Sequence, residues 1–83
     1  MRITVTIVPK TGPHYSETRE IAGPPSLCRA RVLAMDALES SGITKGAIRV
    51  FEGDERHPAD ADYVFFGSID NLQTVRIGAE EED

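Results

Sequence analysis

The chain has 83 residues, a formal net charge of −5 and a single cysteine. A chain of this length forms one small domain, and one cysteine excludes an internal disulfide scaffold and fits a reducing compartment. No run approaches the roughly 20 apolar residues of a membrane span, and the N-terminal segment lacks the apolar block of a signal peptide. We therefore expect a cytoplasmic protein without membrane contact.

The charge is unevenly distributed along the chain. Residues 1–51 contain seven Lys or Arg against four Asp or Glu, whereas residues 52–83 contain two against ten. An acidic half repels nucleic acid and attracts basic surfaces, including the nucleic-acid grooves of other proteins. The basic residues are too few and scattered for direct nucleic-acid binding. We therefore expect a protein or nucleoprotein partner.

Two strands are predicted before the only long helical segment. Residues 2–8 alternate in polarity, with Ile3, Val5 and Ile7 on one face. Residues 14–21 form a poorer strand because charged residues separate its apolar ones. That composition is typical of a strand at the edge of a sheet.

Residues 26–41 carry the helical pattern, with Ser26 as the predicted N-cap and Gly42 as the predicted stop. Apolar residues recur at steps of three and four, which places them on one face. This predicted core face consists of Leu27, Ala30, Leu33, Ala34, Ala37 and Leu38.

A second stripe on the helix consists of Cys28, Val32 and Met35, with Glu39 beyond. Two interpretations stay open. Cys28 and Met35 widen the buried side while Val32 is an ordinary exposed apolar residue, or Val32 and Met35 face a partner. The second interpretation includes a homodimer.

The charges of the helix oppose its dipole. Arg29 and Arg31 lie in the early turns, whereas Asp36 and Glu39 lie in the later ones. No opposite charges within the helix have the spacing that would compensate. A partner or a neighbouring strand would explain the arrangement, although the penalty is small.

Three strands are predicted after the helix, at residues 47–52, 62–67 and 72–77. The middle strand is apolar on both faces in the segment 63–66, which indicates a central strand or one whose outer face meets a partner. The order β-β-α-β-β-β predicts an α+β fold of two layers, with one helix on an antiparallel-rich sheet of about five strands.

One helix is too narrow for such a sheet. Five strands span about 20 Å, whereas a helix with its side chains is about 10 Å wide. The sheet must curl, or part of its surface must be shielded or used for binding. Residues 1–78 are predicted to form this single domain, and the acidic residues 79–83 a disordered tail.

The loop at residues 53–61 and its flanks hold the densest cluster of carboxylates. A solvated loop, a contact with a basic partner and a divalent metal site are the three interpretations. The spacing lacks the EF-hand and zinc patterns, so no metal or cofactor is expected. The predicted partner-binding residues are Glu52, Asp54, Glu55, Asp60 and Asp62, together with Val32 and Met35 of the helix.

Catalysis is not expected. Cys28 with His14 or His57 would be needed for a thiolate pair, but no family signature surrounds the cysteine. The sequence also lacks a phosphate-binding loop and a dinucleotide fingerprint. We predict a protein that is not an enzyme.

Several short segments resemble the small phage anti-CRISPR proteins that act against type I systems. They are Thr4-Val5-Thr6, Pro9-Lys10, Tyr15, Ala34-Met35-Asp36-Ala37 and Tyr63-Val64-Phe65-Phe66-Gly67-Ser68. The resemblance touches about half of the chain. The resemblance implies a compact, non-catalytic inhibitor that occupies a surface of a host nucleoprotein complex, often with carboxylates where nucleic acid would bind. It implies no specific site residue.

The opening strand and its turn also resemble the start of HicB-type antitoxins, although the helix here follows the second strand and no DNA-binding segment follows. A HicB-like antitoxin and a self-associating structural or assembly protein are the alternative functions. The leading hypothesis is an acidic inhibitor in the cytoplasm of a host cell.

Overall fold

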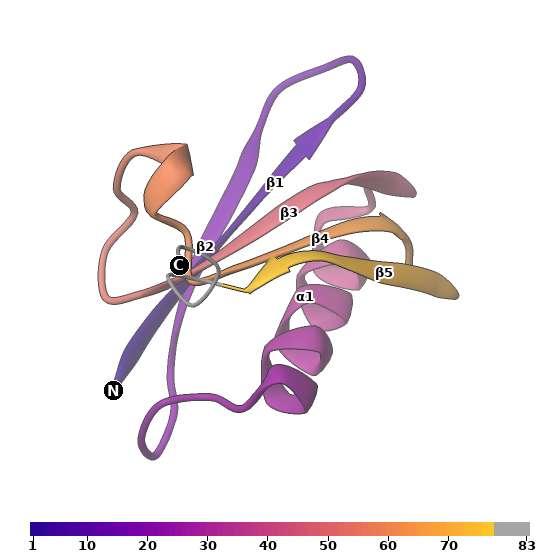
Figure 1. Ribbon diagram of the computed structural model, residues 1–83. Coiled ribbons are helices and arrows are strands. Elements are labelled where there is room, and N and C mark those ends of the chain that lie inside the picture. Colours follow the sequence, from indigo (N-terminus) through magenta and orange to yellow (C-terminus); the bar gives the residue numbers. More distant parts are fainter. Residues whose placement is uncertain (78–83) are drawn as a thin grey trace.

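The computed structural model describes residues 1–77, which form one five-stranded sheet and one long helix (Figure 1). The elements are β1 (Arg2–Pro9), β2 (Tyr15–Glu20), α1 (Leu27–Ser41), β3 (Lys45–Glu52), the short 3-10 helix η1 (Pro58–Asp60), β4 (Tyr63–Ser68) and β5 (Asn71–Ile77). All strand pairs are antiparallel, in the order β2-β1-β3-β4-β5. The predicted α+β fold is confirmed, and the predicted disordered tail lies outside the described residues.

Both predicted ends of the helix are confirmed by their hydrogen bonds. The Ser26 hydroxyl accepts a hydrogen bond from the backbone N–H of Arg29 at 3.1 Å. At the other end, Gly42 has a φ of 77°, and its N–H donates to the carbonyl of Leu38 at 3.2 Å. A left-handed residue ends a helix in this way at little cost when it is glycine.

The helix packs on the sheet face that we call the inner face; the opposite face is the outer face. Buried inner-face residues of the strands are Ile3, Val5 and Ile7 of β1, Ile48 and Val50 of β3, and Phe65 of β4. Helix residues Ala30, Leu33, Ala34, Ala37 and Leu38 pack against them, as the apolar periodicity predicted. The alternation of strand side chains thus places the whole main core on one side of the sheet.

The edge strand β2 carries polar side chains on the inner face. The Tyr15 hydroxyl donates to the Glu17 carboxylate at 2.8 Å, and Arg19 pairs with Glu17 at 2.5 Å and with Asp36 of α1 at 3.5 Å. At the other edge, Arg31 of α1 donates to the backbone carbonyl of Leu72 in β5. Neighbouring strands therefore provide partners for two helix charges that oppose the dipole.

No helix within residues 1–77 is long and apolar enough to cross a membrane. The only long one, α1, has 15 residues, fewer than the roughly 20 that a bilayer requires.

Replacement of Gly67 tests the geometry of the β4–β5 hairpin. Gly67 has a φ of 138°, and an added Cβ would collide with the backbone carbonyl of Asn71. We expect Gly67→Ala to lower the free energy of unfolding by more than about 2 kcal/mol, because strain and collision act together. Urea denaturation measures the change, with Ser68→Ala as the control, expected within about 0.5 kcal/mol of the wild type. Equal midpoints for the two variants would contradict this geometry.

Candidate functional site

Residues 53–62, which we call the acidic loop, fold over one end of the outer face (Figure 1). Thr4 and Phe51 lie opposite each other in β1 and β3, on the face away from the helix, and both are buried. The Thr4 hydroxyl donates to the carbonyl of Gly53 at 2.8 Å, and the Arg56 guanidinium lies 5.5 Å from the centre of the Phe51 ring. The acidic loop therefore covers a small second core.

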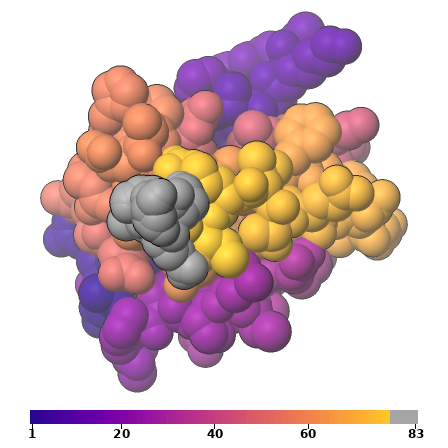
Figure 2. All heavy atoms as spheres, viewed as in Figure 1, coloured from indigo at the N-terminus to yellow at the C-terminus, as the bar shows by residue number. Residues whose placement is uncertain are grey.

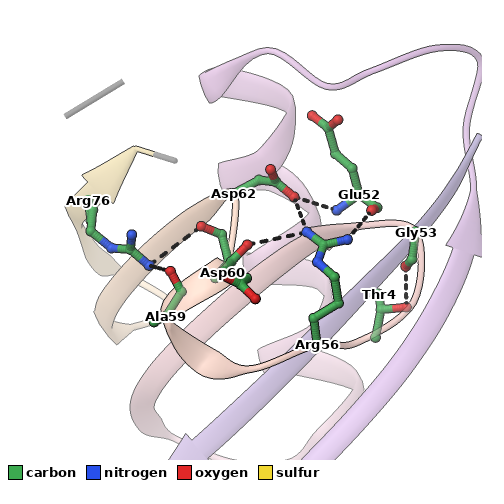
Figure 3. Close-up of polar contacts among 9 residues, drawn as sticks. Thr4, Glu52, Gly53, Arg56, Ala59, Asp60, Asp62 and Arg76 are labelled. Carbon is green, nitrogen blue, oxygen red and sulfur yellow. Dashed lines mark hydrogen bonds and ion pairs between the residues drawn. The ribbon is translucent and has the colours of Figure 1, made fainter. Parts of the chain in front are cut away.

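Arg56 joins both ends of the acidic loop (Figure 3). Its guanidinium donates to the carbonyl of Glu52 at 2.8 Å and to that of Asp60 at 3.2 Å, and it pairs with the Asp62 carboxylate at 3.0 Å. The same carboxylate accepts a hydrogen bond from the backbone N–H of Glu52 at 2.7 Å. These bonds tie the entry of the loop to its exit.

Two further contacts fix the middle of the acidic loop. Arg76 of β5 donates to the carbonyl of Ala59 at 3.2 Å (Figure 3). It also donates to the carbonyl of Ala61 at 3.5 Å. The His57 ring nitrogen Nδ1 accepts a hydrogen bond from the N–H of Ala59 at 3.0 Å, which begins η1. These contacts tie the middle of the loop to β5 and to its own backbone.

The five predicted carboxylates have different environments. Asp62 is engaged within the acidic loop, and Asp54 pairs with Arg2 at 2.5 Å on the surface. Glu52 is half-buried, whereas Glu55 and Asp60 are exposed. Asp60 takes part in the contacts of the loop through its backbone: its N–H donates to the carbonyl of His57 at 2.8 Å, and its carbonyl accepts from Arg56. Glu55 and Asp60 are therefore the carboxylates best placed to contact a partner.

The helix residues predicted to bind a partner lie on the opposite side of the sheet. Val32 is 45% exposed, and Met35 is half-buried and packs against the main core. Cys28 is exposed. The structure therefore separates Val32 and Met35 from the acidic loop, so that one small partner surface would not contact both sets.

Sequence patterns left one part of the outer face unassigned. Val8, Ala47 and Phe66 lie side by side in three neighbouring strands, and Phe66 is 46% exposed. We call these three residues the apolar row. The run of apolar residues at 63–66 was a signal for such a surface, but only the strand register shows which residues join it.

A cleft of about 530 Å³ lies beneath the turn between β1 and β2. Tyr15 contributes to its lining, as do Lys10 and His14 of the turn and Lys45 at the start of β3. The hydrogen bond to Glu17 raises the pKa of Tyr15, and burial and the charge of Glu17 act in the same direction. The cleft therefore combines basic groups with a phenol that keeps its proton at high pH.

The described residues, 1–77, include no cluster of three or more His, Cys, Asp or Glu side chains positioned to hold a metal ion. Comparison with known proteins found no matching family model, no matching curated protein and no matching solved structure. The functional argument therefore depends on the geometry of this chain.

Alanine substitutions of two neighbouring acids test the division between structural and free carboxylates. We expect Asp62→Ala to lower the free energy of unfolding by about 1–2 kcal/mol, because Arg56 and the N–H of Glu52 lose their common acceptor. Asp60→Ala is the matched control and should change stability by less than about 0.5 kcal/mol. Urea denaturation measures both. A larger loss for Asp60→Ala would mean that Asp60, and not Asp62, holds the loop.

The titration of Tyr15 tests the contact with Glu17. Because Glu17 raises the Tyr15 pKa above the ordinary value of 10.0, Glu17→Gln should lower it towards that value. The stabilising effect of this contact is present below the ordinary pKa and is lost as the pH rises through the raised one. Phenolate absorbance, compared with that of Tyr15→Phe, isolates this tyrosine. An unchanged midpoint in Glu17→Gln would contradict the assigned cause.

Proposed function

We propose that this chain is a non-catalytic binding protein that presents the acidic loop to a basic surface of a protein or nucleoprotein complex. The observation that carries the proposal is the exposure of Glu55 and Asp60 on a loop whose backbone is held by Arg56 and Arg76. A loop that is already ordered loses little conformational entropy when it binds. Its carboxylates are therefore suited to recognition.

The overall charge supports the same proposal. The net charge of −5 attracts a basic partner over a distance of about 10 Å at 0.1 M salt, which speeds association. The chain also supplies internal partners for Asp54 and Asp62. This leaves a small group of exposed carboxylates that a basic groove would neutralise.

Together with the resemblance to anti-CRISPR proteins, this surface leads us to propose an inhibitor of phage or mobile-element origin that acts in the cytoplasm of a host cell. Its target would be a type I CRISPR nucleoprotein complex. The carboxylates of the acidic loop would occupy basic residues that otherwise bind nucleic-acid phosphates. This mode of inhibition requires no cofactor and no reaction.

Charge reversal on the acidic loop tests the proposal. We expect the Glu55→Lys/Asp60→Lys variant to lose at least about tenfold in affinity for a purified type I complex, and to stop blocking its binding of target DNA. Glu39→Lys/Asp70→Lys is the control, because it changes the net charge equally at two exposed residues outside the loop. Surface plasmon resonance measures affinity, and gel shift measures DNA binding. Circular dichroism should find all variants folded.

Equal inhibition by the two double variants would exclude the acidic loop as the contact. Absence of binding by the wild type would exclude this class of target. An affinity that is unchanged between about 0.1 M and 0.5 M salt would contradict an electrostatic contact.

A further inference from the structure

The outer face carries an apolar row that no element of the described chain covers. The strand register aligns Val8 of β1 with Ala47 of β3, and Ala47 with Phe66 of β4. Val8 and Ala47 are half-buried, and Phe66 is 46% exposed. The main core lies on the inner face, and the acidic loop covers Phe51 further along β3. The apolar row is therefore free to pack against another molecule.

Basic side chains flank the apolar row on both sides. Towards the acidic loop, the next outward-facing row contains Thr6, which is buried, and Arg49 and Val64, which are half-buried. On the far side, Lys45 of β3 lies opposite Ser68 of β4 in the strand register, and the Lys45 Nζ lies 5.5 Å from the centre of the Phe66 ring. The outward-facing residues of β1, β3 and β4 in these rows include no acid. The open surface therefore favours an acidic ligand.

The outer face has opposite charges at its two ends. In Figure 2 the orange atoms of the acidic loop and the indigo and purple atoms of the β1–β2 hairpin project at different ends of the sheet. The loop end carries the exposed carboxylates of Glu55 and Asp60, whereas the other end carries Lys10 and Lys45 against one acid, Asp70, in the turn between β4 and β5. A two-fold rotation about an axis that lies in the plane of the interface, perpendicular to the strands, turns one outer face onto the other and exchanges these ends. The outer face is therefore complementary to a second copy of itself.

We propose that a second copy of this chain binds to the outer face and forms an antiparallel, two-fold dimer. Such an axis, placed between the Arg49 row and the apolar row, sets Arg49 of each copy against Ala47 of the other, beside the Phe66 ring that neighbours Ala47 in the row. It also sets the acidic loop of each copy against Lys45 of the other. Packed sheets lie about 10 Å apart, which leaves space for one layer of loop at each end.

A second copy suits this surface better than nucleic acid does. The acidic loop borders the open rows on the same face. Its carboxylates therefore repel a phosphate that approaches these rows, whereas they attract Lys45 of a second copy at the same distance. The chain has a net charge of −5. In β1, β3 and β4, the cations of the open rows are Lys45 and Arg49. In the dimer, the acidic loop of each copy instead contacts the basic end of the other copy, so the same charge contact forms twice.

The expected dimer is weak and depends on salt. A standard interface buries about 800 Å² per partner, and strands of six to eight residues in a five-stranded sheet offer a face of about this size or less. The dimer should therefore form at micromolar concentrations. Because it uses Glu55 and Asp60, it excludes the contact with a basic partner described above.

Sedimentation velocity from about 5 to 200 µM at about 0.05 M salt tests the dimer, and about 0.5 M salt should weaken it at least about tenfold. Phe66→Asp should give a monomer across this range. Val32→Asp is the matched control, because Val32 is equally exposed but lies on the helix; this variant should still dimerise. Both substitutions replace exposed side chains, and circular dichroism checks that the variants are folded.

A charge exchange between two variants tests the relative orientation of the copies. Lys10→Glu/Lys45→Glu makes both ends acidic, and Glu55→Lys/Asp60→Lys makes both ends basic. Each variant alone should be monomeric, whereas an equal mixture should form a heterodimer, because both contacts then join opposite charges. No other protein is needed, so failure of this test leaves the proposed inhibitor function untouched.

Three results would overturn the proposed dimer. The first is a wild-type monomer at about 200 µM in low salt, and the second is a dimer that Val32→Asp dissociates and Phe66→Asp does not. The third is a mixture of the two charge variants that stays monomeric. Binding of a fluorescent single-stranded DNA by monomeric wild type, lost in Phe66→Asp, would assign the outer face to nucleic acid instead.

Discussion

The architecture follows from one constraint, which is that a single helix is narrower than a five-stranded sheet. The helix α1 covers the inner face of β1, β3 and β4 and reaches β5. At the edge of the sheet, the inner face of β2 is closed by ion pairs of Arg19 with Glu17 of the same strand and with Asp36 of α1. Within residues 1–77, no α-helix covers the outer face, so its burial within the chain depends on the acidic loop.

The acidic loop takes the place of a second helix over one end of the outer face. It buries Phe51 and Ala61, with exposed fractions of 1% and 2%, and keeps its own backbone satisfied through Arg56 and Arg76. Four of its hydrogen bonds join arginine to backbone carbonyls, and these bonds hold the chain without using the carboxylates of Glu55 and Asp60. The loop is therefore a structural cover and a charged surface at the same time.

The sequence predicted the fold well because its signals are local. Alternation in β1, the N-cap at Ser26 and the stop at Gly42 each depend on neighbouring residues, and the structure confirms all three. The choice of inner face, the structural use of Asp62 and the apolar row depend on strand pairing between distant residues. In the sequence, Arg56 has no pattern that distinguishes it from the other charged residues around it. Only the fold shows that it joins Glu52, Asp60 and Asp62.

The two proposed contacts of the acidic loop, with a basic partner and with a second copy, exclude each other. If the carboxylates of Glu55 and Asp60 face Lys45 of a second copy, a basic partner must displace that copy before it can bind. A dimer held by few cations and one short apolar row is weak enough for a strongly basic groove to displace it, because the groove offers more positive charge to the same carboxylates. Self-association would then shield the acidic loop and the apolar row until the basic partner is present, and it would lower the affinity for that partner only slightly.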